Sequence, residues 1–306
     1  MLRPIFKHNL LGSSAGAGYN VPVGNIVPLL RTIGIIPLEV SPLPILTLTT
    51  DFGLKDGFPA VLKGVIWGIC PEAQIADITH SITPQNISEG AYALWRAYAF
   101  FPAGTVHIAV VDPGVGTQRR PIAVHLGEHT FVGPDNGLFT PMYDDAARHG
   151  WPVEIVHLTN ENYWLPDVSQ TFHGRDIFAP VAAHLAKGIV LRNLGPVIED
   201  PVRLSLPAAE RTSSGWRAHV TVVDVFGNLT TDLPAAFLQE KAIREAVLFR
   251  LKGREVHGLV SYYGACSPGE LVALVDSENF IELAMVNGSA ALSLQAQVGD
   301  IVEVIQ

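Results

Sequence analysis

The alternation of apolar runs and amphipathic segments between residues 45 and 111 constrains the fold of this chain most strongly. "ILTLTT" (45–50), "AQIADIT" (73–79) and "TVHIAVV" (105–111) are typical of strands, and the segments 57–70 and 86–101 between them are typical of helices. This order predicts parallel strands joined by right-handed crossovers. Because ligands bind beyond the carboxyl ends of such strands, we expect a site where "TDFG", "DITH" and "DPGVG" follow them.

The later part of the chain predicts a second kind of sheet. "PIAVHL" and "TFVGP" predict a hairpin, followed by a strand at 153–159 and a helix at 176–188. From Trp216 onward, short strands alternate with turn residues. We therefore expect an α/β N-terminal domain with a mainly parallel sheet and a smaller, mostly antiparallel β C-terminal domain. The expected bounds are a poorly ordered extension at 1–44, the α/β domain at 45–200, a linker at 201–215 and the β domain at 216–306.

The composition narrows the class of partner. The chain has a formal charge of −9 and no cluster of lysine and arginine, so nucleic acid and anionic membranes are poor candidates. Cys70 and Cys266 are its only cysteines and are far apart in the sequence. This favours a reducing compartment, and we expect a cytoplasmic protein.

Residues 1–44 contain an apolar stretch that does not predict a membrane anchor. Prolines, Arg31 and Glu39 interrupt the stretch before it reaches the ~18 apolar residues that a membrane helix needs. A signal-peptide core with a cleavage site is not evident either. For these reasons we interpret residues 1–44 as a poorly ordered extension.

The motif "HLGEH" (125–129) has the His-x-x-Glu-His spacing of some zinc peptidases. That spacing brings two histidines to one face only in a helix. Gly127 and the strand-like residues on both sides disfavour a helix here. We expect a hairpin turn and no metal site.

The stretch "VVDPGVGTQRR" (110–120) contains the strongest candidates for chemistry. It lacks the third glycine of a dinucleotide fingerprint and the ending of a P-loop, so we interpret its glycines as a tight turn. Asp112 follows a buried strand, where a charge is costly unless it is paired. Arg119 could return across the loop to pair with it. The residues alone leave a structural ion pair and a catalytic pair open.

Five further residues are candidates with plain alternatives. His173, in "TFHGRD", could be an acid, a base or a hydrogen-bond donor, or it could be structural. Asp51 could accept two hydrogen bonds from a ribose diol or cap a helix. The stretch "VDVFGNLTTD" (223–232) predicts a turn with Asp224, Phe226 and Asn228. These three side chains could hold an ammonium, a flat ring and a base edge, or the turn could be only a polar hairpin turn.

The order of these motifs resembles one protein family. "LTTDFGLKDGF", "DITHSITPQNI", "VVDPGVGTQRR", "FVGPDNGLFTP", "TFHGRDIFAPVAAHLA" and "VDVFGNLTTD" together resemble the S-adenosylmethionine hydroxide adenosyltransferases, relatives of fluorinating and chlorinating enzymes. The resemblance covers residues 45–306. It implies that water cleaves S-adenosylmethionine to adenosine and L-methionine without a cofactor or metal. It also implies a homotrimer whose sites lie between one subunit's N-terminal domain and a neighbour's C-terminal domain.

The resemblance also assigns roles to residues. A trio that handles the water falls on Asp112, Arg119 and His173. Asp112 could only orient the water, or Arg119 and His173 could lower the pKa of the water so that hydroxide forms. The residues that would bind the substrate comprise a ribose-binding aspartate and four contacts to the methionine and adenine parts, namely Asp51, Asp224, Phe226, Asn228 and Ser277.

Departures from the halogenating relatives favour water over halide. Those relatives have an aromatic residue where this chain has Gln85, and a long insertion where this chain has only "HLGEHTFVGP". They also lack both Asp112 and His173. An arginine follows the serine that matches Ser277, whereas Glu278 follows it here, so recognition of the substrate carboxylate must differ. The alternatives are a halogenase of the same superfamily and a non-catalytic protein that binds S-adenosylmethionine or adenosine.

Overall fold

The computed structural model describes residues 43–238 and 241–306. Of the extension expected at 1–44, all but the last two residues lie outside the described part of the chain. Leu43–Gln306 forms one compact unit. Among the described residues, no helix is both long enough and apolar enough to cross a membrane.

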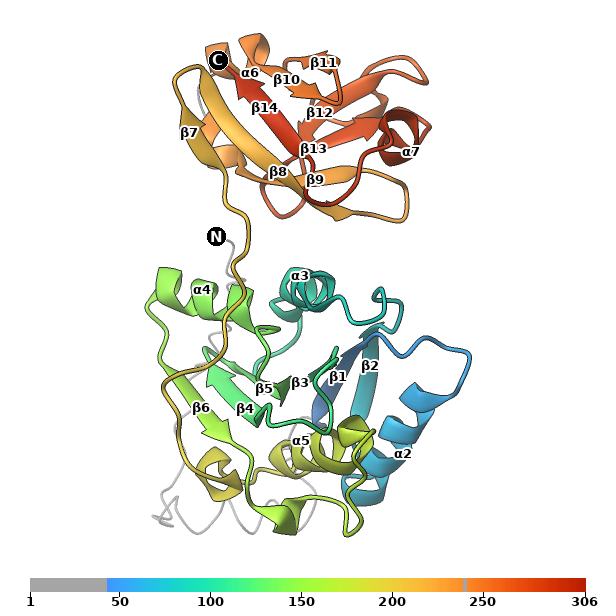
Figure 1. Ribbon diagram of the computed structural model, residues 1–306, viewed down its shortest axis with the longest axis vertical. Coiled ribbons are helices and arrows are strands. Elements are labelled where there is room, and N and C mark those ends of the chain that lie inside the picture. The colour runs from blue at the N-terminus through green and yellow to red at the C-terminus, as the bar shows by residue number, and fades with distance from the viewer. Residues whose placement is uncertain (1–42, 239–240) are drawn as a thin grey trace, which may run out of the picture. The chain divides into compact units, whose positions relative to one another are not determined.

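The first sheet has six strands in the order β2-β1-β3-β5-β4-β6 (Figure 1). Parallel pairs join β1 to β2, β1 to β3 and β3 to β5, whereas β4 runs antiparallel to both β5 and β6. The predicted mainly parallel sheet is therefore confirmed. The strands are β1 (Ile45–Thr50), β2 (Gln74–Thr79), β3 (Val106–Val110), β4 (Pro121–Leu126), β5 (His129–Pro134) and β6 (Val153–His157).

The motif "HLGEH" lies across the hairpin of β4 and β5. His125 on β4 stands opposite Thr130, and His129 on β5 stands opposite Leu126. Gly127 has a φ of +56° in the turn between the strands. The predicted hairpin is confirmed. Within 43–238 and 241–306, no three His, Cys, Asp or Glu side chains are grouped so that they could hold a metal ion.

Helices cover both faces of the first sheet. α2 (Phe58–Ile69) and α5 (Ala179–Ala186) lie on one face, and α3 (Ile87–Tyr98) and α4 (Thr140–His149) lie on the other (Figure 1). The residues of β3 alternate between the two core layers. Ile108 and Val110 pack with α2 and α5, whereas Ala109 packs with α3 and α4. Burial on both faces explains why this strand is continuously apolar.

Two helix starts matter for the site. At α3, Asn86 Oδ1 accepts a hydrogen bond from Glu89 N at 3.1 Å, and the Glu89 carboxylate accepts one from Asn86 Nδ2 at 3.2 Å. The two side chains therefore cap the start of this helix together. Before α5, residues Gly174–Phe178 form a π-helical turn, a feature that is frequent at functional sites. Short 3-10 turns occur at Glu161–Tyr163, Leu191–Leu194, Ala235–Leu238 and Tyr263–Ala265.

The segment that leaves the first sheet is bonded to it. Val202 N donates to Asp135 Oδ1 at 2.8 Å, and Leu204 N donates to Thr140 Oγ1 at 2.9 Å. Further along, β7 (Glu210–Thr212) pairs with the second sheet. The range expected as a linker thus contains an anchored part and a short strand.

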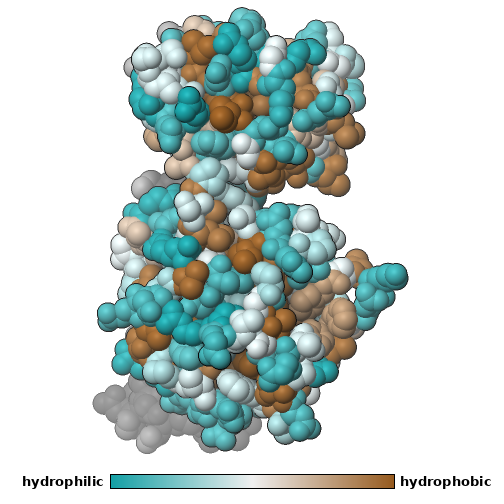
Figure 2. Space-filling view, in the orientation of Figure 1, coloured by the Kyte–Doolittle hydropathy of each residue, from teal (hydrophilic) through white to brown (hydrophobic). Residues whose placement is uncertain are grey.

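The second sheet is antiparallel throughout, in the order β11-β10-β14-β8-β9-β13-β12 with β7 on β8. Its core includes Phe249, Leu283 and Val302. On the face shown in Figure 2, hydrophobic residues are interspersed among hydrophilic ones. The elements are β8 (Gly215–Val223), β9 (Leu229–Pro234), β10 (Leu248–Leu251), β11 (Arg254–His257), β12 (Leu271–Val275), β13 (Phe280–Met285), β14 (Ile301–Ile305), α6 (Lys241–Ala246) and α7 (Ala290–Leu294).

The turn expected at 223–232 is shorter than the sequence indicated. Val223 still belongs to β8, and β9 begins at Leu229. Leu229 and Thr231 are buried in the second sheet. A polar strand whose threonines face the interior was therefore mistaken for part of the turn.

Candidate active site

The carboxyl edge of the first sheet collects the predicted reactive residues of the N-terminal region. β1 and β3 are parallel neighbours, and Thr50 at the end of β1 pairs with Val110 at the end of β3. Asp51 directly follows the end of β1, and Asp112 follows the end of β3 after one residue, Val111. They therefore leave the sheet at the same edge, which is where ligands bind in open α/β sheets.

Asp112 and Arg119 form a two-point ion pair. Arg119 Nε lies 2.9 Å from Asp112 Oδ1 and 3.0 Å from Oδ2, and Arg119 Nη2 also donates to Oδ2. The side chains of the aspartate and arginine are only 6% and 9% exposed. The pairing expected from the sequence is confirmed, and its geometry is of the strong, orienting kind.

The glycine loop brings this pair to a second segment. Gly116 has a φ of +76°, and a Cβ there would lie 2.3 Å from the carbonyl oxygen of Gln170. Only glycine allows both this backbone conformation and this approach. The loop therefore packs against the chain three residues before His173.

His173 joins the ion pair through its ring. Its Nδ1 lies 3.0 Å from Arg119 Nη2. Because a guanidinium only donates, Nδ1 accepts, and the neutral ring carries its proton on Nε2. Burial and the adjacent Arg119 lower the pKa of His173, against the opposing effects of Asp112 and Asp176. The imidazole is therefore neutral at neutral pH.

The turn that carries His173 is held by buried groups. Asp176 is fully buried and accepts hydrogen bonds from Ser169 N at 2.8 Å and Arg175 Nε at 2.6 Å. Burial raises the pKa of Asp176, but these hydrogen bonds outweigh it and lower the pKa overall. Phe178, at the end of the π-helical turn, lies under the Arg119 guanidinium, with 5.2 Å from its ring centroid to Cζ.

Asp51 is half-buried and is oriented by a backbone donor. Its Oδ2 accepts a hydrogen bond from Gln85 N at 2.8 Å, and Gln85 has the unusual φ of +67°. The N-cap residue of α2 is Gly57, so Asp51 does not cap that helix. The rings of Phe52 and Phe172 are 5.6 Å apart. They join the Asp51 turn to the His173 turn.

The C-terminal candidates lie in turns of the second sheet. Asp224 Oδ1 accepts from Phe226 N at 2.9 Å and from Asn228 N at 2.8 Å, and Asp224 Oδ2 accepts from Asn228 Nδ2 at 2.9 Å. Phe226 is 74% exposed. Ser277 is exposed in the turn between β12 and β13. In this single chain, the polar hairpin turn considered from the sequence is what these residues form.

Within residues 43–238 and 241–306, the cavity that Asp224 lines does not include the N-terminal trio. Asp224 lines a cavity of about 820 Å³ together with Thr83, Asn86 and Arg96. Asp112, Arg119 and His173 are not among the residues that line it. The structure therefore brings together the N-terminal candidates, and separately the residues of the β8–β9 turn.

Four residues of the site region were missed by sequence reasoning. Gln170 contributes only a carbonyl oxygen, so its side chain carries no signal. Asp176 and Phe178 belong to the quoted stretch "TFHGRDIF", and their position beside His173 could have marked them. Arg96 pairs with Glu278, 182 positions away, and no local pattern indicates that contact.

Comparison with known proteins covers both regions. Residues 46–195 match the SAM hydroxide adenosyltransferase N-terminal domain, and residues 218–303 match the SAM hydroxide adenosyltransferase C-terminal domain, where SAM is S-adenosylmethionine. A crystal structure of an uncharacterized conserved protein from Thermotoga maritima has a TM-score of 0.77 and 36% identity. The match covers 85% of this chain and 99% of that one.

Relatives with functional names are also similar over most of the chain. An (R)-S-adenosyl-L-methionine hydrolase from Salinispora tropica is 42% identical over 85% of this chain and 97% of its own length. One from Thermus thermophilus is 37% identical over 82% and 95%. A fluorinase from Actinoplanes is 30% identical over 68% and 78%. The chain belongs to the SAM hydroxide adenosyltransferase family.

Proposed function

We propose that this protein hydrolyses S-adenosylmethionine to adenosine and L-methionine. The observation that carries the proposal is the Asp112–Arg119–His173 constellation at the carboxyl edge of the first sheet, in which the side chains of the ion pair are almost fully buried. Family membership and the hydrolase names of similar proteins support the same reaction. S-adenosylmethionine is then the substrate, and we infer that no resident cofactor is needed.

The reaction displaces a neutral leaving group. An oxygen lone pair of water or hydroxide attacks the ribose C5′ in line with the sulfur, and the C5′–S bond breaks with its electron pair passing to sulfur. The sulfonium loses its charge as methionine leaves, and the water loses one proton overall. Because charge disappears when hydroxide attacks a sulfonium, a dry site favours the transition state over the separated ions.

The geometry favours hydroxide formation over simple orientation of water. Arg119 engages both oxygens of Asp112, so we assign to the aspartate the role of fixing the guanidinium and accepting one hydrogen bond from the nucleophile. Arg119 Nη1 is buried without a hydrogen-bond partner among the described residues, and His173 presents Nε2–H. Two such donors lower the pKa of a water held between them.

We assign substrate binding to the remaining candidates. Asp51 Oδ2 is occupied by Gln85, and Oδ1 can accept from the ribose diol. The exposed ring of Phe226 can stack on adenine, and Asn228 can bond the base edge. Asp224 and Ser277 face the amino acid end of the substrate.

We infer that the working unit is a homotrimer with sites between subunits. Phe226 and Val225 are 74% and 92% exposed, as expected for a turn that another copy covers. The trio does not share the cavity of Asp224 in one chain, so a neighbour would complete the site. We also infer a cytoplasmic location, because Cys70 and Cys266 are both free thiols.

Product analysis tests the proposed reaction. Pure protein is mixed with S-adenosylmethionine near neutral pH, and the products are separated by chromatography with and without added fluoride or chloride. We expect equal amounts of adenosine and L-methionine under all conditions. A halogenated nucleoside would instead support a halogenase. We test for this product because a fluorinase is similar to this chain. Tight calorimetric binding with no product over hours would support a non-catalytic binding protein.

A further inference from the structure

Arg96 connects helix α3 to the turn that carries Ser277. Its Nη2 donates to Glu278 Oε2 at 2.8 Å, and the two side chains are 25% and 19% exposed. The rings of Trp95, next to Arg96, and Phe280, two residues after Glu278, meet edge to face at 5.8 Å between centroids. An ion pair and an aromatic pair therefore hold the β12–β13 turn against α3.

The turn itself is closed by a buried carboxyl group. Asp276 Oδ1 accepts from Glu278 N at 3.0 Å and from Phe280 N at 2.8 Å, while Asp276 Oδ2 is buried and has no hydrogen-bond partner among the described residues. Glu282 on β13 is buried as well. Arg96 is thus the cation that interacts with Asp276, Glu278 and Glu282 together.

Removing Arg96 leaves this acidic turn without its counter-charge. Burial raises the pKa of Glu278, but the pairing with Arg96 outweighs it and lowers the pKa overall, so Glu278 is ionised in the pair. Without the guanidinium, the Glu278 carboxylate and its acidic neighbours repel one another in a half-buried place. The turn would then move away from α3, and Ser277 would move with it.

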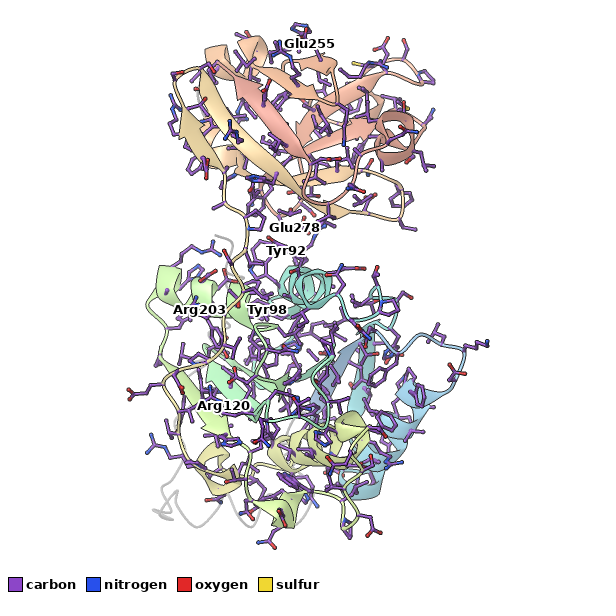
Figure 3. All side chains as sticks on the ribbon, viewed as in Figure 1. Tyr92, Tyr98, Arg120, Arg203, Glu255 and Glu278 are labelled. Carbon is purple, nitrogen blue, oxygen red and sulfur yellow. The ribbon has the colours of Figure 1, made fainter. Side chains whose placement is uncertain are left out.

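The residue before the N-cap of helix α3 also contacts the candidate ribose-binding aspartate of the same chain. The helix begins after Asn86, and the preceding Gln85 donates its N–H to Asp51. Arg96 lies ten positions after Asn86, which is about 15 Å along an α-helix at 1.5 Å per residue. The α3 segment thus contacts Asp51 through Gln85 and the Ser277 turn through Arg96, and in the proposed trimer these two contacts belong to two neighbouring sites. Tyr92 of α3 and Glu278 both line a cavity of about 190 Å³, and both side chains are labelled in Figure 3.

We propose that Arg96 is a positioning residue that, through its ion pair with Glu278, sets the Ser277 turn for the methionine half of the substrate. This rests on the proposed function. It also gives Glu278 a role that requires no contact with the substrate carboxylate. Ser277 and the backbone of its turn then bind that carboxylate.

The test separates the methionine half of the substrate from the adenosine half. Arg96→Ala should raise KM for S-adenosylmethionine and the Kd of L-methionine about tenfold, while kcat changes less than about threefold and the Kd of adenosine stays unchanged. Arg96→Lys should recover part of the effect. The exchanged pair Arg96→Glu with Glu278→Arg should recover most of it, since it restores the ion pair with reversed polarity.

A matched control comes from another ion pair of the second sheet. Arg250 pairs with Glu255 and Glu303 through exposed side chains, and Arg250→Ala should leave KM and both product affinities unchanged. If Arg96→Ala lowers the melting temperature strongly, Glu278→Gln tests the same pair with less disturbance. Its expected result is a KM increase of a few-fold with unchanged adenosine affinity.

Three outcomes would overturn the positioning role. These are an unchanged KM and methionine affinity in both single variants, equal weakening of adenosine and methionine, or no recovery in the exchanged pair. A wild-type protein that forms no adenosine would contradict the proposed function instead. The product affinities would still report on Arg96 in that case, so the two failures can be told apart.

Discussion

The carboxyl edge of the first sheet and the β8–β9 turn of the second sheet organise their polar groups in opposite ways. At the edge, Arg119 bonds to Asp112 in the same loop and to His173, which is 54 positions away, and the side chains of Asp112 and Arg119 are almost fully buried. In the turn, Asp224 and Asn228 belong to five consecutive residues and bond to each other, and Phe226 points into solvent. Under the proposed function, the difference teaches that the reacting residues are held in place before substrate binds, whereas the substrate-binding turn is left exposed for a neighbouring subunit to cover.

This contrast follows from what each part of the reaction needs. Charge changes at the reacting carbon, and preorganised donors in a water-poor place stabilise such changes most effectively. Recognition of a base and an amino acid needs surface area and accessible polar groups. Variants in the two regions should therefore affect different kinetic constants.

The largest effect on turnover is expected at Asp112, in the ion pair at the carboxyl edge of the first sheet. Asp112→Asn keeps the size of the side chain but loses the charge that fixes Arg119, and turnover should fall by ~10²-fold or more with little change in substrate affinity. Steady-state kinetics and calorimetry measure the two quantities. Asp200→Asn is a matched control, because that exposed aspartate pairs with Arg120 away from the trio. Near wild-type turnover in Asp112→Asn would remove the water-handling role.

Arg119→Lys tests whether the shape of the guanidinium matters beyond its charge. A lysine keeps the positive charge but cannot make the two-point pair with Asp112 and also donate to His173. We expect kcat to fall about thirtyfold, with KM nearly unchanged, because the lost interactions act on the nucleophile. A larger change in KM than in kcat would mean that Arg119 binds substrate.

His173 is expected to make kcat/KM depend on pH. Since burial and Arg119 lower its pKa below the ordinary 6.5, the ring stays neutral above that pH and gains a proton only as the pH falls through the lowered value. The added proton would sit on Nδ1 and replace the hydrogen bond from Arg119. We therefore expect kcat/KM to be level above pH 6.5 and to fall about tenfold per unit on the acid side of the lowered pKa.

The matched variant for this pH profile is His173→Asn. It should lower kcat about tenfold at neutral pH and abolish the acid limb, because the titrating group is gone. An acid limb that persists unchanged in this variant would assign the titration to another group.

The contrast also explains what the sequence could predict. Asp112 and Arg119 are seven positions apart in one loop, so their pairing could be inferred from the turn between them. The bond from Arg119 to His173 spans 54 positions and depends on the contact of Gly116 with Gln170, which is a matter of backbone packing. The motif order could place His173 in the site through resemblance, but not give its tautomer.

The missed elements have physical causes of the same kind. β9 has the sequence LTTDLP, whose three consecutive polar residues break the alternation typical of a strand, so burial of Thr230 and Thr231 decided its structure. α4 is a short helix rich in charged residues, and it was not predicted because its apolar positions become a helical face only against α3. Local patterns thus predicted the elements that bury their own apolar residues, and not those whose structure depends on a distant partner.

The smallest effect on turnover is expected in the β8–β9 turn, which carries Phe226. Phe226→Ala removes a ring that is 74% exposed, so the melting temperature should stay within about one degree of wild type, as for other exposed positions. If the ring stacks on adenine in the assembled site, KM and the Kd of adenosine should rise about tenfold while kcat is unchanged. Phe226→Tyr keeps the stacking face and should bind adenosine like wild type. A lower kcat with unchanged adenosine affinity would contradict this comparison, since it would place the β8–β9 turn in the chemical step together with the carboxyl edge of the first sheet.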